Sequence, residues 1–188
     1  KISVLGKFMN IIDFENINVG YDEKIILKNI TLKIKEKEHW AILGANGSGK
    51  STLMKLIQSE IHPRKTNPYK KEILGKATYS IFELKKDLGI ITNDLHNYFA
   101  THGNFLTGYI TVLSGHYSSI GVFKHQDFTP EQHEKAKQTM KFLEIEHLTD
   151  KYVEEMSTGE LRKCIVARAL IHEPKAFVLD EPTVGLDI

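Results

Sequence analysis

A glycine-rich segment in the first third of the sequence carries its clearest chemistry. Residues 44–51 read Gly-Ala-Asn-Gly-Ser-Gly-Lys-Ser and match the pattern G-x-x-x-x-G-K-[ST]. Backbone N–H groups of such a loop converge on phosphate oxygens, its glycines permit positive φ, and the following helix adds its positive end. We expect Lys50 to reach the β- and γ-phosphates of a nucleotide and Ser51 to bind Mg²⁺. A glycine-rich turn with a chance Lys-Ser pair is the alternative, expected in about one chain in a hundred.

The predicted nucleotide-binding residues form one continuous run. They are Gly44, Ala45, Asn46, Gly47, Ser48, Gly49, Lys50, Ser51 and Thr52.

Two adjacent carboxylates follow a short apolar stretch near the end of the sequence. Residues 177–179, Phe-Val-Leu, precede Asp180 and Glu181. A parallel strand delivers the residues after it to the carboxyl edge of the sheet, where nucleotides bind. There Asp180 is expected to hold Mg²⁺, and Glu181 to act as the general base that orients the attacking water. A strand that simply ends in two solvated acids is the alternative, and the phosphate loop upstream weighs against it.

The segments around the phosphate loop predict the strand–loop–helix order that this chemistry needs. Residues 40–43, Trp-Ala-Ile-Leu, are a continuous apolar run, which is typical of a central strand buried on both faces. Residues 51–60 are expected to form a helix, because their apolar side chains share one face. These side chains are Leu53, Leu56 and Ile57.

Further strands and helices are indicated elsewhere. Alternating apolar and polar residues at 30–35 predict a half-buried antiparallel strand, and the prolines within 61–71 indicate a surface connection. Short strands are expected at 72–75, 88–91 and 177–179. Segments 93–103 and 105–124 show no pattern that assigns an element.

Two capping boxes predict helices in the second half. Thr129 can cap a helix that starts at Pro130, with Gln132 closing the box. Ser157 and Glu160 have the same spacing and open a helix that runs to about residue 172. The apolar faces are Ala136, Met140 and Leu143 in the first helix, and Leu161, Ile165 and Ala169 in the second.

Composition sets the class of protein. The 188 residues, 41% hydrophobic and 26% charged, suffice for one domain with a buried core. A net charge of +1 and only three arginines give no direct indication of nucleic-acid binding. The single cysteine, Cys164, excludes an intramolecular disulfide and is expected to pack in the core. No apolar run approaches the roughly 18 residues of a membrane helix, so any membrane part is expected elsewhere.

Three motifs in this order resemble the nucleotide-binding domain of the ABC (ATP-binding cassette) transporters. Residues 156–160, Met-Ser-Thr-Gly-Glu, with Leu-Arg-Lys and Ala-Arg-Ala-Leu after them, are similar to the family's signature region, usually Leu-Ser-Gly-Gly-Gln. The phosphate loop precedes it, and Asp180 to Thr183 and a D-loop-like 185–187 follow. The resemblance implies an α/β fold: a P-loop NTPase-type, mainly parallel sheet flanked by helices, with an N-terminal antiparallel β subdomain and a helical signature subdomain.

The resemblance also implies a function and partners. One nucleotide-binding domain over 1–188, with a helical subdomain at about 94–172, would bind ATP and Mg²⁺ and hydrolyse ATP to drive transport through a separate integral membrane subunit. Two copies would pair head to tail in the cytoplasm or at the inner face of the cell membrane. The trans contact to the partner's γ-phosphate would come from Ser157, Thr158, Gly159 and Glu160. Tyr21 stands where the family stacks an aromatic on adenine, although a packed or surface tyrosine is an equal alternative.

The sequence departs from the family pattern at three points. Asn93 replaces the glutamine that contacts Mg²⁺ and the attacking water; it keeps the amide but is one methylene shorter. Thr158 replaces a glycine, and Glu160 replaces a glutamine, which would place negative charge near the partner's γ-phosphate, partly offset by the helix dipole. The family continues to a switch histidine that is not found after Asp187, so the sequence is expected to be part of a longer protein.

Other functions stay open. A soluble ABC ATPase acting on a ribosome, DNA or another cytosolic target fits Asn93 and the altered signature. Residues 112–121 are also loosely similar to a bacterial subgroup associated with molybdate uptake or photorepair. An ATP-gated dimerisation module would not need Glu181. A kinase would need an acceptor site and a lid, and the signature residues would have no role in it.

Overall fold

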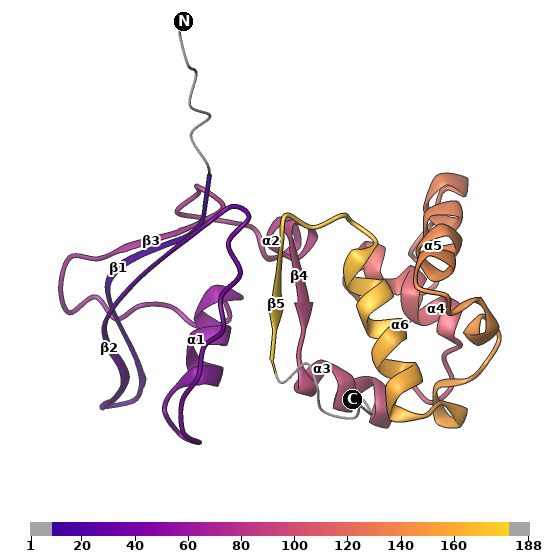
Figure 1. The fold of residues 1–188 in the computed structure, drawn as a ribbon, viewed down its shortest axis with the longest axis horizontal. Helices are drawn as coiled ribbons and strands as arrows, with labels where there is room; N and C mark the ends of the chain where they lie inside the picture. Colours follow the sequence, from indigo (N-terminus) through magenta and orange to yellow (C-terminus); the bar gives the residue numbers. More distant parts are fainter. Residues whose placement is uncertain (1–8, 181–188) are drawn as a thin grey trace, which may run out of the picture. The chain divides into compact units, whose positions relative to one another are not determined.

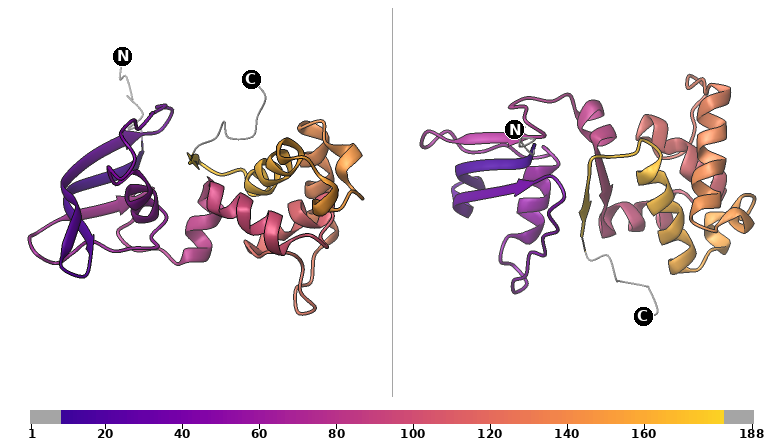
Figure 2. Two further views of the ribbon diagram at one scale, coloured as in Figure 1. Left: turned by 90° about the horizontal axis from the view of Figure 1, so that it is seen from below. Right: turned by 45° about the horizontal axis from the view of Figure 1, so that its top comes forward.

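The computed structural model describes residues 9–180 and divides into two compact units. The first comprises Lys1–Ile81 and the second Phe82–Ile188. Figures 1 and 2 show the elements of each unit. The predictions for Glu181 and for 182–187 lie outside the described residues.

The first unit is an antiparallel sheet with one helix against it. Strands β1 (Asn10–Tyr21), β2 (Lys24–Lys35) and β3 (Lys70–Ile73) lie in the order β2-β1-β3. Helix α1 (Lys50–Ile57) packs against β2 and buries the predicted face of Leu53, Leu56 and Ile57. The predicted antiparallel strand and helix are therefore confirmed, while β3 begins two residues before the predicted 72–75.

A tight hairpin joins β1 to β2. Only Asp22 and Glu23 separate the strands, and Asp22 has a φ of 47°. A Cβ on Gly20 would lie 2.0 Å from the Lys24 carbonyl oxygen, so only glycine lets the two strands approach this closely.

A buried carboxylate ties the three strands together. Asp13 of β1 is 2% exposed, and one of its oxygens lies 2.8 Å from Lys70 Nζ of β3 and 3.3 Å from Lys33 Nζ of β2. The hydrogen bond from Lys70 lowers the pKa of Asp13. The acid remains charged in the sheet because both neighbouring strands supply a cation.

The prediction of a buried strand at residues 40–43 is wrong. This run lies outside every described strand, with Trp40 55% and Leu43 91% exposed. An apolar run becomes a central parallel strand only where neighbouring strands supply hydrogen bonds and cover on both faces. The described strands of the first unit form an antiparallel sheet that does not include this segment.

The described part of the second unit combines a parallel strand pair with five α-helices. Strand β4 (Leu88–Ile91) pairs in parallel with β5 (Ala176–Leu179), as predicted for 88–91 and 177–179, although only Val178 of β5 is buried. The helices are α2 (Ile81–Asp87), α3 (Asn93–His102), α4 (Gly108–Leu113), α5 (Pro130–Phe142) and α6 (Thr158–Leu170), with short 3-10 turns η1 (Ser114–Tyr117), η2 (Glu146–Leu148) and η3 (Val153–Glu155). None of the helices described between residues 9 and 180 has the length and apolar character of a membrane span.

Hydroxyl side chains cap the N-terminal ends of four helices in this unit. Thr92, Thr107, Thr129 and Ser157 each accept a hydrogen bond from a backbone N–H of the first turn of α3, α4, α5 and α6, respectively. Both predicted capping boxes are present, at Thr129 with Gln132 and at Ser157 with Glu160. The starts of α5 and α6 are thus confirmed.

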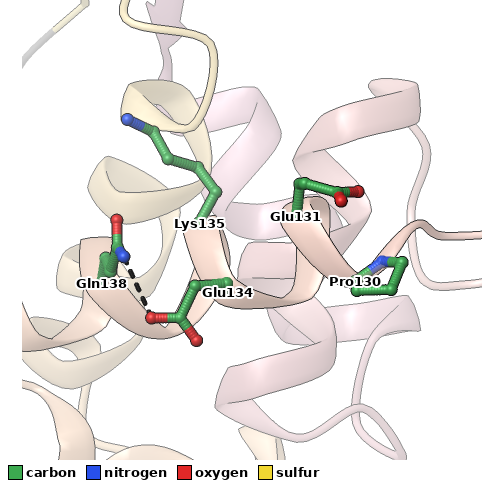
Figure 3. Close-up of a pocket in the computed structure, with 5 residues that line it drawn as sticks. All are labelled: Pro130, Glu131, Glu134, Lys135 and Gln138. Carbon is green, nitrogen blue, oxygen red and sulfur yellow. Dashed lines mark hydrogen bonds between the residues drawn. The ribbon is translucent and has the colours of Figure 1, made fainter.

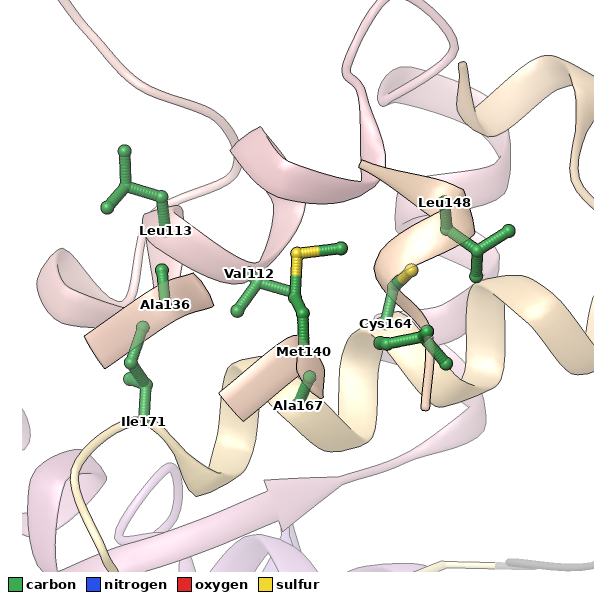
Figure 4. Close-up of a cluster of buried hydrophobic side chains, with 9 residues drawn as sticks. Val112, Leu113, Ala136, Met140, Leu148, Cys164, Ala167 and Ile171 are labelled. Atoms are coloured by element: carbon green, nitrogen blue, oxygen red, sulfur yellow. The ribbon is translucent and has the colours of Figure 1, made fainter. Parts of the chain in front are cut away.

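The core of the second unit lies where α4, α5 and α6 meet (Figure 4). Its buried members are Val112, Leu113, Ala136, Met140, Ile145, Leu148, Cys164, Ala167 and Ile171. Burial raises the pKa of the Cys164 thiol to about 12, so this cysteine packs as a small apolar group, as predicted.

Candidate nucleotide-binding site

The phosphate loop is a turn that leads directly into α1. Asn46 and Gly47 form the turn, and Gly47 and Gly49 have φ values of 78° and 96°. Gly49 is the N-cap of α1 in the left-handed conformation, and no side chain caps the helix. The first turn of α1 therefore presents its backbone N–H groups without a side-chain acceptor, the arrangement that binds a phosphate.

Lys50 folds back over this loop. Its Nζ donates to the carbonyl oxygens of Gly44 at 2.6 Å and Ala45 at 2.9 Å. The ammonium group thus lies against the loop, and the backbone that binds phosphate also orients the cation. The next residue, Ser51, is exposed, whereas Thr52 is buried.

Gly49 packs closely against β2. A Cβ on Gly49 would lie 2.8 Å from Leu27 Cδ2 of β2, whereas one on Gly44 would first meet the Ser48 hydroxyl at 2.6 Å, a side-chain end that can rotate away. By contrast, nothing lies within 4 Å of a Cβ on Gly47. The loop therefore contacts β2 through Gly49, whereas at Gly47 it is the positive φ that favours glycine.

Tyr21 is the last residue of β1 and pairs with Lys24 across the hairpin. Its side chain is 48% exposed, so its ring is available to a planar ligand, but adenine stacking stays a prediction.

In the second unit, Asn93 and Asp180 follow neighbouring parallel strands. Ile91 of β4 pairs with Leu179 of β5, and the Asp180 N–H donates to the Ile91 carbonyl oxygen at 2.9 Å. Asn93 begins α3 two residues after β4 ends. Both residues therefore lie at the carboxyl edge of the strand pair, the edge where α/β proteins bind nucleotides.

Two contacts join the start of α3 to the signature helix α6. Arg162, 3% exposed, donates from Nη2 to Asn93 Oδ1 at 2.7 Å. His96 Nε2 lies 3.4 Å from the Thr158 carbonyl oxygen. The guanidinium group of Arg162 thus orients the amide oxygen of Asn93. Arg162 and His96 were not among the predicted site residues, because their partners are distant in sequence.

The signature turn is closed by its own side chains. The Ser157 hydroxyl accepts the Glu160 N–H at 3.2 Å, and Glu160 Oε2 accepts the Ser157 N–H at 2.7 Å. Lys151 Nζ lies 2.9 Å from both oxygens of Glu160. Thr158 and Gly159 are the first two residues of α6, and Thr158 is exposed.

The charge of Glu160 is therefore balanced within the chain. The hydrogen bond from Lys151, followed by that from the Ser157 backbone, lowers the pKa of Glu160 to about 2. The helix dipole was the only compensation expected from the sequence, and Lys151 is the larger contributor that sequence reasoning missed. A lysine nine positions before Glu160 is not a recognisable pattern within a capping box.

Each unit carries a group of the kind that Mg²⁺ prefers, the Ser51 hydroxyl in the first and the Asp180 carboxylate in the second. Mg²⁺ in nucleotide sites is held by one or two such oxygen ligands together with phosphates and water, and the assignment of these two residues to it stays a prediction. Lys50 and Ser51 belong to the first unit, whereas Asn93, Asp180 and the signature residues belong to the second.

A surface pocket on α5 is unrelated to the predicted site residues (Figure 3). It is lined by Pro130, Glu131, Glu134, Lys135 and Gln138. Gln138 donates to Glu134 at 3.0 Å, and Lys135 pairs with Glu173. Its polar side chains thus already have partners within the helix and its neighbourhood.

Three features define a P-loop nucleotide-binding protein. They are the phosphate loop, the parallel strand pair that ends in polar residues, and the capped N-terminal end of α6. The family model for ABC transporters matches residues 27–184, and the chain belongs to the ABC transporter ATP-binding proteins, a family of ATPases.

Curated relatives support this membership. An uncharacterized ABC transporter ATP-binding protein of Methanocaldococcus jannaschii is 34% identical over 175 residues, covering 92% of this chain and 57% of the relative. The ABC transporter ATP-binding protein ModF of Escherichia coli is 33% identical, covering 90% of this chain and 34% of its own length. The chain thus spans between a third and three-fifths of these two relatives.

Solved structures confirm the predicted fold class. CbiO1 of Clostridium perfringens, described as part of the ABC transporter complex cbiONQ, has a TM-score of 0.74 at 30% identity, covering 95% of this chain and 68% of that one. The ATP-binding cassette MJ1267 in its ADP conformation has a TM-score of 0.75 at 25% identity, covering 95% and 71%.

Proposed function

We propose that the protein binds Mg·ATP at the phosphate loop and hydrolyses it as a head-to-tail dimer, to drive transport through a separate membrane subunit. The observation that carries this proposal is the phosphate loop itself. Gly47 and Gly49 have positive φ, α1 starts without a side-chain cap, and Lys50 lies over the loop carbonyls. Membership of the ABC family supports hydrolysis as the outcome of binding.

Each predicted residue has a distinct role in this proposal. Lys50 stabilises negative charge on the β- and γ-phosphates, and Ser51 and Asp180 would hold Mg²⁺, which neutralises charge on the phosphate oxygens. Glu181 would accept a proton from the attacking water, and Asn93 would orient that water through its amide. The partner's signature turn would close the site on the γ-phosphate.

The partners are proposed from similarity. CbiO1, described as part of a transporter complex, is 30% identical over most of this chain, which supports a membrane subunit in a separate chain and a cytoplasmic position at the membrane. The transported substrate is not specified by any described residue.

Titration calorimetry with Mg·ATP tests the site. The unsubstituted protein should bind, and Lys50→Ala should lose most of the affinity because it removes the cation that lies against the loop. Lys55→Ala, in the last turn of the same helix, is the matched control and should bind normally. Equal binding by Lys50→Ala would overturn the assignment of the loop.

Hydrolysis needs its own test in the full-length protein. Glu181→Gln should abolish turnover while keeping ATP binding and trapping the dimer. Turnover that survives this substitution would show that another group activates the water.

A soluble ABC ATPase without transport is the second candidate. The shorter Asn93, held by Arg162, favours it, because the family's glutamine at this place also senses the transporter. Co-purification of the full-length protein with an integral membrane subunit would exclude this candidate, and co-purification with a cytosolic target alone would favour it.

A further inference from the structure

The signature turn carries an acid where a phosphate is expected, and a lysine from another segment covers it. Glu160 is the third residue of α6, and both its carboxylate oxygens lie 2.9 Å from Lys151 Nζ. The same carboxylate accepts the Ser157 backbone N–H at 2.7 Å. Lysine, acid and N-cap serine thus form one connected group at the start of the helix.

Backbone contacts fix the place from which Lys151 reaches the turn. Its N–H donates to the Leu148 carbonyl oxygen at 3.2 Å, and its carbonyl oxygen accepts the Gly108 N–H at 3.0 Å. A Cβ on Gly108 would lie 2.3 Å from the Leu148 carbonyl oxygen, so glycine is required for this approach. Two residues further on, the Val153 N–H donates to the Leu106 carbonyl oxygen at 2.9 Å. Lys151 therefore extends from an anchored backbone towards Glu160.

The ion pair is expected to add little to the stability of the fold. Its two side chains are 32% and 26% exposed, and ion pairs within reach of water contribute little to folding. A carboxylate without a partner at a helix start would, however, repel an incoming phosphate and oppose the helix dipole's attraction for it.

We propose that Lys151 is a positioning residue for the signature turn. It cancels the charge of Glu160 and holds the carboxylate on the Ser157 N–H, so that the turn can meet the γ-phosphate of a second protomer. This inference rests on the proposed function, because it needs a phosphate delivered to Ser157.

A double-substitution cycle in the full-length protein tests the proposal. Lys151→Met should lower kcat/KM for ATP about fivefold, as expected for one uncompensated charge near a phosphate. In a Glu160→Gln background, the same Lys151→Met substitution should change kcat/KM by less than about twofold, because no charge remains to cancel. A full fivefold loss in that background would overturn the proposal, since it would show that Lys151 acts independently of Glu160.

Two further measurements separate this inference from the proposed function. Lys137→Met, on the exposed side of α5, should leave kcat/KM unchanged, and Lys151→Met should leave the affinity of the phosphate loop for Mg·ATP unchanged. If Lys50→Ala abolishes hydrolysis but Lys151→Met has no effect, only the inference fails. If Lys50→Ala has no effect on binding or hydrolysis, the proposed function fails first.

Discussion

Helices α1 and α6 both begin where a phosphate is expected, but their first turns are built differently. The N-cap of α1 is Gly49, in the left-handed conformation and without a side-chain acceptor. The N-cap of α6 is Ser157, in the extended conformation, whose side chain and Glu160 satisfy two N–H groups of the turn. The α1 turn thus depends on a ligand for hydrogen bonds that the α6 turn makes within the chain.

The source of positive charge differs in the same way. Lys50 is the first residue of α1 and contacts its own loop, whereas Lys151 reaches α6 from the segment before it. The first turn of α1 leaves backbone N–H groups for a ligand, whereas the first turn of α6 is complete without one. This difference is compatible with the proposal that α6 contacts a phosphate only when a second protomer brings it.

The largest expected effect comes from removing the cation of the first turn. Lys50→Ala should reduce ATP hydrolysis by more than about a hundredfold, the usual loss when one oriented donor to a reacting oxygen is removed. Steady-state phosphate release measures it, with Lys55→Ala as the control in the same helix. A loss below tenfold would mean that α1 does not depend on its own lysine.

The next largest effect is expected on stability, from replacing the glycines that precede α1. Gly49→Ala should lower the free energy of unfolding by about 2 kcal/mol, because a Cβ there meets Leu27 at 2.8 Å and φ is 96°. Gly47→Ala has the same kind of φ without the contact and should cost only about 1 kcal/mol. Urea denaturation gives both values, and equal losses would show that the contact with β2 is unimportant.

Loss of the Ser157 cap should destabilise the first turn of α6. Ser157→Ala should cost about 1 kcal/mol of unfolding free energy, the usual value for an N-cap hydroxyl. Ser157→Asp can still cap the helix but adds a charge, so it should keep stability and lose hydrolysis. Parallel denaturation and turnover assays separate the two roles, and an active Ser157→Asp protein would contradict a phosphate contact at this turn.

The smallest expected effect is on the pH dependence of stability. The pKa of Glu160 lies at about 2, below its ordinary value of 4.5, so its ionised form stabilises the fold above pH 4.5. This stabilisation should fade as the pH falls from 4.5 towards 2. Glu160→Gln should therefore be less stable than the unsubstituted protein at pH 6, by less than about 1 kcal/mol, and the gap should narrow in acid. Glu154→Gln, on the neighbouring turn η3, is the control in the same urea titrations.

Local signals in the sequence predicted local structure well. Both capping boxes need only residues three apart, and the apolar face of α1 needs only its own helix, so these features were found. Helix α3 was missed because it buries only His96 and Phe99, which leaves little periodicity. The strand expected at 40–43 was wrong because an apolar run does not specify which strands will flank it.

Contacts between distant residues limited the prediction of the site. The phosphate loop was recognisable because all its residues are adjacent. Arg162 meets Asn93 across 69 positions, and Lys151 meets Glu160 only after the intervening turn folds back. Neither contact follows from residue type and spacing alone, so both appear only in the three-dimensional structure.

The pairing of Lys151 with Glu160 also predicts how these two positions evolve. A single mutation at either position leaves one charge without its partner, whereas a joint replacement by neutral residues does not. The glutamine usual in the family at the position of Glu160 needs no lysine beside it. Among related sequences, lysine at the first position should therefore accompany glutamate at the second, so that the two positions are inherited as one character.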